Sequence, residues 1–509
     1  MRQTNLLKST FIIMLVSCIS RVIGFVRDML IASNFGAGMY TDAYNVAVTI
    51  PETIFMLVGL AISTSFLPVL SRIRAEKNED EMYIFANNVI NILFIISVVI
   101  FIITSIFSKE IVGLLGKGFD YNTTLIAIRL TRITLINLLF MSVNACFTAL
   151  LQVNEDFVIP SILGLFFNLP MILYLLFFKN YDIMGLTIAN VIGNFLRVVI
   201  QVPSLVSHRY KYKLFINFKD KELKVILILI IPVIIAAGAN SLNVVVDKAI
   251  ASSLPEGSIS ALGYAEKLIF FINSIITTSI SSVAYPMLAN ARNDGKHKEF
   301  IKILKQSIIY LALLLIPITV GIIVFRKDIV SIIYERGEFT EYAVSLTTLA
   351  LFGYSFGIFF TGMRDILNST LFSMGKTKIT TLNGVIGVTI NVILSITLSR
   401  YIGIIGISLA SAIAMIITSI LLFSSIVKIE NNFKLNDIIK KIVIIVFNSI
   451  LMGTVIIIFV NFIEARISKI LVLFFGTIIG IIVYIILCYV FKIKEITEVK
   501  NLILRKVKK

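Results

Sequence analysis

The sequence predicts an all-α polytopic membrane protein with 14 transmembrane helices, organised as two six-helix lobes followed by two C-terminal helices. Three observations predict this class. Of the 509 residues, 58% are hydrophobic, and the mean hydropathy is +0.97. Apolar runs of about 20 residues, the length with which a helix crosses a bilayer, recur from end to end. Basic residues favour one predicted side of the membrane, and the first half of the chain resembles the second.

The predicted spans follow the apolar runs in chain order. Most are longer than the minimum, which suits helices that cross the hydrocarbon core with a tilt. The 14 predicted spans are residues 10–33, 42–68, 83–107, 125–151, 158–178, 183–206, 223–251, 259–288, 302–325, 342–372, 379–399, 403–427, 438–463 and 467–491.

Lysine and arginine support this count and orient the chain. With the N-terminus in the cytoplasm, and with up to four residues of the adjoining span ends counted with each segment, the segments on that side hold 29 of the 46 Lys and Arg residues, the opposite loops hold 9 and the rest of the spans hold 8. This is the positive-inside pattern. It predicts a multi-pass protein of the cell (cytoplasmic) membrane with both termini in the cytoplasm. The net charge of +17 then reflects loops near anionic lipid, and we expect no nucleic-acid partner.

An internal repeat defines the predicted domains. Three segments recur at an offset between 218 and 221 residues: FLPVLSRIRAEKNEDE at 66–81 with AYPMLANARNDGKHKE at 284–299, SKEIVGLLGKGF at 108–119 with RKDIVSIIYERGEF at 326–339, and MGLTIANVIG at 184–193 with IGISLASAIA at 405–414. Six is an even number of spans, so both copies have the same orientation, as in transporters with parallel repeats. The predicted domains are an N-lobe (1–215), a C-lobe (216–428), and two further helices with a basic cytoplasmic tail (429–509).

The first predicted span carries charges at bilayer depth. Arg21 and Asp28 share a helix face with Ser17 and Gly24, and Arg27 lies beside them. Charges at this depth are costly and usually face a water-filled cavity or a partner. The stripe therefore favours a polar cavity, and a structural Arg–Asp pair between packed helices is the alternative.

A second cation lies in the predicted eighth span. Lys267 shares a helix face with Ser274, Thr278 and Ser281. Cations that face a common cavity suit an anionic substrate, and arginine in particular binds phosphate through two parallel hydrogen bonds. A structural pair between Lys267 and Glu266, or another acid, is the alternative.

Two further spans carry oxygen-bearing side chains. Asp247 follows Asn243 on the seventh span, and Asn391 and Ser395 share a face of the eleventh. Such oxygens suit a small monovalent cation, although Asp247 could instead pair with the adjacent Lys248. The three cysteines form no spaced motif, and the two histidines lie in basic loops. We therefore expect no catalytic residues and no enzyme activity.

Several segments resemble the MurJ (MviN) family, the lipid II flippases of the multidrug/oligosaccharidyl-lipid/polysaccharide exporter superfamily. The resemblance covers nearly the whole chain. It is carried by SRVIGFVRDMLIASNFGAGMYTDAY at 20–44, the GYAEKL…YPMLA segment, YERGEFT at 334–340 and GKTK at 375–378.

The resemblance implies a transporter that moves an undecaprenyl-pyrophosphate-linked glycopeptide to the outer leaflet for cell-wall synthesis. Its partners would be this substrate, membrane lipid and the cell-wall synthesis machinery. It implies no cofactor other than Na⁺ as a coupling ion. The residues at family substrate positions are Arg21, Arg27, Asp28, Asp42, Glu266 and Lys267, and those at sodium positions are Asp247, Asn391, Ser395 and Ser411.

The sequence also departs from the family pattern. The second span reads PETIFMLVGLAIS and lacks the family's arginine pair and the acidic residue that follows it. Lys267 stands where arginine is usual, and Ser395 where a carboxylate can occur. Two other functions stay open at this point: a flippase for another polyprenyl-pyrophosphate-linked saccharide, and a cation-coupled drug exporter of the same superfamily.

Overall fold

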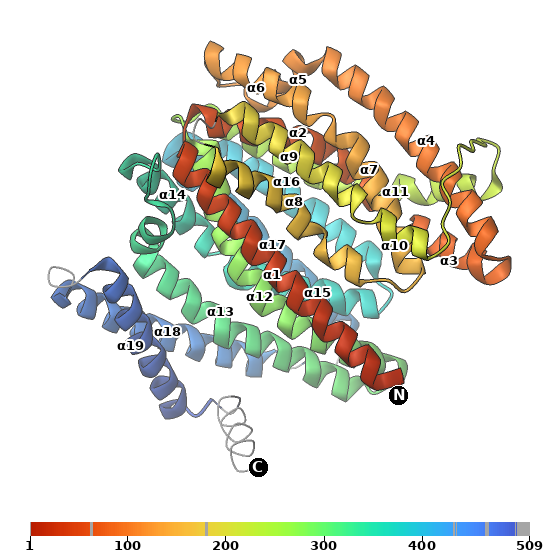
Figure 1. The fold of residues 1–509 in the computed structure, drawn as a ribbon. Coiled ribbons are helices and arrows are strands. Elements are labelled where there is room, and N and C mark those ends of the chain that lie inside the picture. The colour runs from red at the N-terminus through yellow and green to blue at the C-terminus, as the bar shows by residue number, and fades with distance from the viewer. Residues whose placement is uncertain are drawn as a thin grey trace. The chain divides into compact units, whose positions relative to one another are not determined.

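The computed structural model describes residues 2–61, 65–178, 182–430, 433, 435–463, 468–493 and 495. Every regular element in these ranges is a helix, labelled α1 to α19 in Figure 1, so the predicted all-α class is confirmed. The chain divides into two compact units. Unit 1 comprises Met1–Ser260 with Arg336–Thr340, and unit 2 comprises Ala261–Glu335 with Glu341–Lys509.

The helices follow the predicted spans. Ten helical segments of the described residues are long and apolar enough to cross a membrane, two of which join consecutive helices (α6 with α7, and α9 with α10). The pair α14 and α15, bent by 46°, makes a possible eleventh span. Each of the 14 predicted spans falls on one helix or on consecutive helices, so the predicted number is compatible with the structure. The helices are α1 (Arg2–Phe35), α2 (Met39–Ala61), α3 (Leu67–Glu76), α4 (Glu79–Ile106), α5 (Ser108–Leu115), α6 (Tyr121–Thr134), α7 (Asn137–Val153), α8 (Val158–Phe177), α9 (Ile183–Val199), α10 (Val202–Ser207), α11 (Lys221–Ala251), α12 (Ser258–Asn293), α13 (His297–Tyr334), α14 (Glu341–Ser355), α15 (Ile358–Ser373), α16 (Thr377–Ile402), α17 (Ile404–Ile429), α18 (Asn436–Ile463) and α19 (Lys469–Val490).

Short polar side chains begin several helices of unit 1. Asn78 caps α4 by accepting a hydrogen bond from the backbone of Glu81, and Asp182 caps α9 in the same way. Asp120 accepts hydrogen bonds from two backbone N–H groups at the start of α6. These groups would otherwise lack partners in the first turn. The hydroxyl of Thr123, which also donates to Asp120, and these two N–H groups together lower the pKa of the exposed Asp120 carboxyl.

Small residues allow the helices of unit 1 to pack closely. α1 lies against α8, which in turn lies against α9. At the crossing of α1 and α8, a Cβ on Gly164 would lie 2.0 Å from Ser20 Oγ, and one on Gly24 would lie 3.4 Å from Asn168 Nδ2. Close approach of this kind is how membrane helices gain packing contacts. It brings the polar side chains of α1 next to α8.

In unit 2, the long helix α13 packs against α14, α15, α18 and α19, while α17 packs against α14, α15 and α16. Glycines again mark the close contacts. A Cβ on Gly453 of α18 would lie 2.5 Å from Val320, and one on Gly476 of α19 would lie 2.4 Å from Phe325. The two C-terminal helices are therefore fitted against α13 rather than loosely attached.

The compact units and the predicted domains rest on different criteria. The sequence repeat divides the chain at residue 215, whereas helix contacts place α11 with unit 1 because α11 packs against α2 and α5. A repeat boundary records sequence similarity and a contact boundary records packing, so the two need not coincide. The three predicted domains stay a prediction.

Gly337 makes a tight backbone contact with Ser33 in unit 1. Gly337 has a φ of +58°, and a Cβ at this position would lie 2.2 Å from the carbonyl oxygen of Ser33. We expect Gly337→Ala to lower the melting temperature, because both the left-handed backbone and the contact oppose a side chain. The measurement is thermal unfolding of the purified protein in detergent.

Gly295→Ala is the matched control. Gly295 has a φ of +70°, but a Cβ added there would meet no heavy atom of the described chain within 4 Å. This variant therefore bears the conformational cost of about 1–2 kcal/mol without the steric one. An equal decrease in melting temperature for the two variants would contradict the role given to the contact with Ser33.

Candidate substrate-binding site

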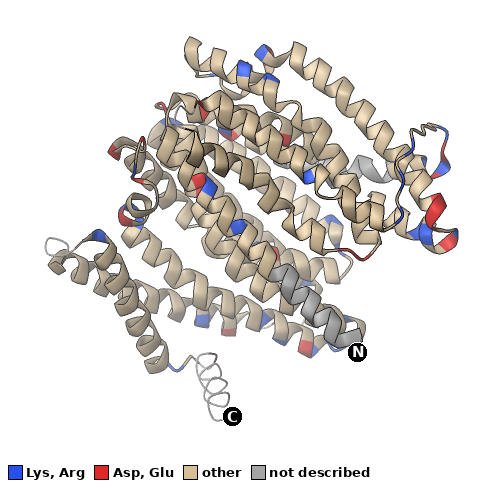
Figure 2. Cartoon of the chain, in the orientation of Figure 1, with Lys and Arg blue, Asp and Glu red and all other residues tan. Residues whose placement is uncertain are grey.

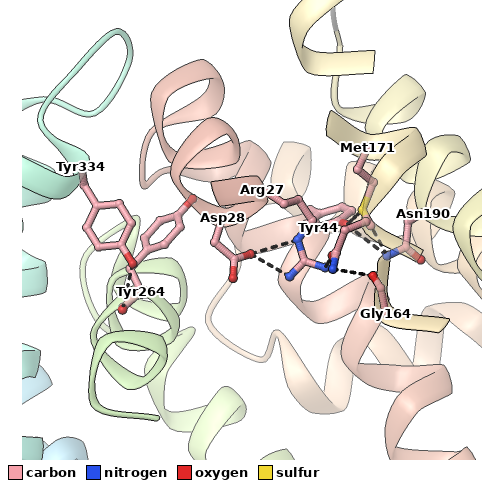
Figure 3. A network of polar contacts seen from close by, with 9 residues as sticks. Arg27, Asp28, Tyr44, Gly164, Met171, Asn190, Tyr264 and Tyr334 are labelled. Carbon is pink, nitrogen blue, oxygen red and sulfur yellow. Dashed lines mark hydrogen bonds and ion pairs between the residues drawn. The ribbon is translucent and has the colours of Figure 1, made fainter. Parts of the chain in front are cut away.

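The charged stripe of α1 is organised around Arg27. Its Nε and Nη2 donate to Oδ1 of Asp28 at 3.2 and 2.8 Å, and the side chains are 17% and 7% exposed. Figure 3 shows the guanidinium with one edge toward Asp28 and another toward α8. The pair matches both the predicted polar stripe and the structural alternative. It satisfies a charge that would be costly if left alone among apolar helices.

α8 provides two contacts to Arg27 that sequence reasoning missed. Nη1 of Arg27 donates to Oδ1 of Asn168 at 2.8 Å, and Asn168 is itself held by a hydrogen bond from its Nδ2 to the carbonyl of Gly164 at 2.7 Å. The guanidinium carbon lies 5.5 Å from the ring centre of Phe167. Asn168 lies 141 residues from Arg27. The only sequence signal was an asparagine within an apolar span, four residues after a glycine.

A third group of polar residues continues from this site along α9. Tyr44 of α2 accepts a hydrogen bond from Nδ2 of Asn190 at 3.3 Å, and Tyr44 and Asn190 both approach the sulfur of Met171 (Figure 3). One helical turn after Asn190, Asn194 accepts from Nη1 of Arg197 at 3.3 Å. Unit 1 therefore carries a polar path through its apolar helices.

Arg197 is the second cation against Phe167. Its guanidinium carbon lies 4.1 Å from the ring centre, closer than that of Arg27. Its Nε is buried and makes no hydrogen bond among the described residues. Arg197 falls inside a predicted span but is not among the predicted site residues, because no acidic residue stands near it in the sequence. Its partner is an aromatic ring on another helix, which spacing cannot reveal.

The other two predicted substrate-binding residues of unit 1, Arg21 and Asp42, differ in exposure. Arg21 is exposed on α1, six residues before Arg27, whereas Asp42 is buried. Figure 2 shows that basic residues concentrate at helix ends and loops, with few along the middle of helices. Arg21 is an exception, because it lies within α1 and not at its end. Its exposed guanidinium can approach an anionic group at this depth.

Asp42 binds the start of another helix. It accepts hydrogen bonds from the backbone N–H groups of Gly257 and Ser260, both at 2.8 Å, and from the hydroxyl of Ser260 at 2.5 Å. These donors belong to the first turn of α12 and the residue before it. A carboxylate at this position satisfies N–H groups and interacts favourably with the helix dipole. Asp42 thus caps α12 from α2.

In unit 2, Lys267 and Glu266 occupy the first third of α12. Lys267 is half-buried and its Nζ lies 5.6 Å from the ring centre of Tyr264, while Glu266 is exposed. Tyr264 is fixed by Tyr334, whose hydroxyl donates to the Tyr264 carbonyl at 3.4 Å and whose ring centre lies 5.1 Å away (Figure 3). A cation beside an aromatic ring is stabilised without losing its charge.

Three of the predicted sodium ligands meet in unit 2. Nδ2 of Asn391 donates to Oγ of Ser411 at 3.0 Å, and Oγ of Ser395 donates to Oδ1 of Asn391 at 3.2 Å. Asn391 and Ser395 are buried. Their oxygens fit a hard cation, but the three side chains are uncharged and already satisfy one another. Asp247 lies in unit 1, where its Oδ2 accepts from Asn243 at 3.3 Å.

The structure therefore brings together some predicted groups and leaves others as predictions. Arg27 and Asp28 meet in unit 1, and Asn391, Ser395 and Ser411 meet in unit 2. The joint action of Arg27 with Lys267, and of Asp247 with Asn391, stays a prediction. Within the described residues, no group of three or more His, Cys, Asp and Glu side chains could hold a metal ion.

Comparisons with known proteins agree on one family. A family model described as lipid II flippase MurJ matches residues 31–477. A probable lipid II flippase MurJ of Buchnera aphidicola subsp. Schizaphis graminum is 30% identical over 444 residues, which cover 85% of this chain and 86% of the relative. A lipid II flippase MurJ of Burkholderia cenocepacia is 23% identical over 434 residues, covering 82% and 83%.

Solved structures also include a protein of this family with a similar fold. A lipid II flippase MurJ in an inward closed conformation aligns with a TM-score of 0.80 and 26% identity, covering 95% of this chain and 99% of that one. A multidrug resistance MATE family transporter of the MOP superfamily, in an inward-facing conformation, aligns with a TM-score of 0.63 and 13% identity, covering 82% and 98%. The second likeness concerns the fold alone.

Proposed function

Because the chain belongs to the lipid II flippase MurJ family, we propose that it moves lipid II from the inner to the outer leaflet of the cytoplasmic membrane for cell-wall synthesis. The observation that carries this proposal is the family match over residues 31–477, together with a guanidinium on α1 that is oriented among apolar helices. An oriented guanidinium suits the phosphate oxygens of a pyrophosphate. A flippase for another polyprenyl-pyrophosphate-linked saccharide and a drug exporter are the less favoured alternatives.

The proposed mechanism is alternating access. The pyrophosphate head engages Arg21 and Arg27, and Lys267 supplies a further positive charge, while the polyprenyl chain stays in lipid. Asp28 and Asn168 hold the guanidinium of Arg27 in a fixed plane, so less conformational freedom is lost on binding. A conformational change then exposes the head to the other leaflet. A membrane potential of 100 mV contributes about 2.3 kcal/mol for each charge that crosses.

The protein is a multi-pass membrane protein, and we propose that both termini face the cytoplasm because basic residues are concentrated on that side. We further propose that it catalyses no chemical reaction and that its cargo is an undecaprenyl-pyrophosphate-linked glycopeptide. The cell-wall synthesis machinery, which uses this cargo, is its proposed partner.

Exposure of lipid II at the outer face tests the function and the role of Lys267. In cells that lack their own lipid II flippase, a membrane-impermeant enzyme that cleaves lipid II reports the externally reachable fraction. We expect the wild-type chain to restore cleavage and Lys267→Ala to lower its rate by about tenfold or more, since hydrogen bonds to charged groups contribute about 1.5–3 kcal/mol. Lys267→Arg should retain activity.

Lys298→Ala is the control, because Lys298 is exposed in the first turn of α13. If the wild type restores cleavage and Lys267→Ala does so equally well, lipid II stands as the cargo and the role of Lys267 is wrong. If even the wild type fails at normal membrane levels, another polyprenyl-linked saccharide becomes the better candidate.

We propose Na⁺ as the coupling ion, with oxygen ligands from Asp247, Asn391, Ser395 and Ser411. The buried oxygens of Asn391 and Ser395 support this proposal. Because a ligand that binds only the folded state raises its stability, we expect NaCl to raise the melting temperature relative to choline chloride. Asp247→Asn and Asn391→Ala should each reduce this difference. Asp437→Asn, at an exposed position of α18, should retain it, and a wild type without any difference would contradict the proposal.

A further inference from the structure

The segment between α10 and α11, residues 208–220, is fastened along one side of α4. Nδ2 of Asn87 donates to the carbonyl of Lys211, and Nδ2 of Asn91 donates to the carbonyls of Lys213 and Phe215, at 3.0–3.1 Å. We call residues 208–220 the linker. In Figure 1 it leaves α10 and runs beside α4 before it reaches α11.

The attachment continues beyond Asn87 and Asn91. Asn88 exchanges two hydrogen bonds with the backbone of Asn217, at 3.0 and 2.6 Å, and the hydroxyl of Tyr83 donates to the carbonyl of His208 at 2.6 Å. All three asparagines of α4 are buried. Tyr83, Asn87 and Asn91 recur every four residues, so they form one face of the helix. α4 is therefore built to hold this backbone in place.

The attachment uses the linker's backbone and two of its side chains, since the hydroxyls of Tyr210 and Tyr212 donate to Oδ1 of Asn87 and Asn91 at 2.6 and 2.7 Å. It leaves most of the other side chains exposed. Residues 211–219 are all exposed, and Leu214 is 80% and Phe218 64% exposed. Ile216 and the ring of Tyr212 add further exposed apolar surface, although the Tyr212 hydroxyl is bound to Asn91. In a water-soluble loop this number of exposed apolar side chains would be unusual, because such patches mark interaction surfaces.

Lysines lie at both ends of this apolar row. The sequence from 211 to 219 is KYKLFINFK, and Lys221 follows at the start of α11. The nearby carboxylates have other partners: Asp220 caps α11 and Glu222 pairs with Arg72. The linker thus combines an apolar row with a net positive charge, which Figure 2 shows as basic residues along this segment.

The length of α4 is the basis for placing the linker at a membrane boundary. α4 ends at Ile106, and about 20 helical residues cross the hydrocarbon core. Asn87, to which the linker is attached, lies about 20 residues before the end of α4, where such a crossing segment would begin. The acidic first turn of α4 at 79–81 then lies in water, and the linker lies at the boundary.

We propose that the linker is a membrane-interface anchor that binds an anionic leaflet. Its apolar side chains enter the boundary between headgroups and acyl chains, and Lys211, Lys213 and Lys219 contact lipid phosphates. Lysine is suited to this position because its stem lies along apolar surface while its ammonium reaches the headgroups. Each lysine held near an anionic surface favours binding by about fivefold. The start of α11 is thereby fixed at the lipid surface.

The chain allows a direct test because it contains no tryptophan. Phe218→Trp places a single fluorophore on the linker, and the variant is reconstituted into vesicles of phosphatidylcholine with or without phosphatidylglycerol. We expect lipids brominated near the headgroup to quench the emission by about half or more in anionic vesicles. In this background, replacing Lys211, Lys213 and Lys219 by glutamine should lower the quenching to its level in neutral vesicles.

Asn293→Trp is the matched control, since Asn293 is exposed at the end of α12, just before a polar turn, and has no exposed apolar neighbours. Its emission should respond to acrylamide in water and not to brominated lipid. The proposal is overturned if the tryptophan at 218 behaves like this control. It is also overturned if quenching is independent of phosphatidylglycerol and of the lysines, or if protection from both quenchers shows that protein covers the linker. Normal flippase activity of Phe218→Trp shows that the reconstituted protein is folded.

Discussion

Arg27→Lys should abolish most of the appearance of lipid II at the outer face, even though it keeps the positive charge. Three nitrogens of the Arg27 guanidinium donate hydrogen bonds, two of them to Asp28 and one to Asn168. A lysine ammonium cannot reach both partners in one plane. The loss of one or two charge-assisted hydrogen bonds, each of about 1.5–3 kcal/mol, predicts a decrease on the order of 10- to 100-fold.

The measurement is cleavage of externally reachable lipid II in cells that lack their own flippase, corrected for the amount of protein in the membrane. Arg129→Lys is the control, because Arg129 is an exposed arginine of α6. Asn168→Ala should show an intermediate loss, since it removes one of the three contacts. Full activity of Arg27→Lys would show that charge alone is needed at this position and that the fixed plane of the guanidinium is not.

Much of the fold could be predicted because the bilayer imposes a length on each element. Apolar runs and basic loops located the helices, and the structure agrees. The breaks within predicted spans were harder. The span predicted at 125–151 is divided into α6 and α7 near Leu135, where neither glycine nor proline signals a break. Such a division depends on packing against neighbouring helices, which hydropathy does not record.

In the candidate site, contacts between sequence neighbours could be predicted, whereas contacts between different helices could not. Arg27 and Asp28 are adjacent in sequence, so their pairing could be predicted. Asn168 and Phe167 contact Arg27 only because α1 packs against α8. Small residues at a helix crossing, such as Gly164, help to decide which helices pack against each other. A single sequence shows these glycines but not which helix they approach.

Asp42→Asn should lower the melting temperature clearly, and it separates two roles for this residue. The carboxylate accepts three hydrogen bonds from Gly257 and Ser260. An amide has only one oxygen, so its NH₂ group must face at least one N–H donor of the same turn. The loss of a buried charge-assisted hydrogen bond costs about 1.5–3 kcal/mol, and the favourable interaction with the α12 dipole is lost as well.

Asp120→Asn is the matched control, because Asp120 caps α6 at an exposed site and asparagine is an equally good N-cap residue. Thermal unfolding and lipid II exposure are measured on both variants. A lower melting temperature for Asp42→Asn alone supports the cap between α2 and α12, and transport then falls because the helices are no longer joined at this point. An unchanged melting temperature with lost transport would contradict this cap and support the substrate contact that the sequence predicted for Asp42.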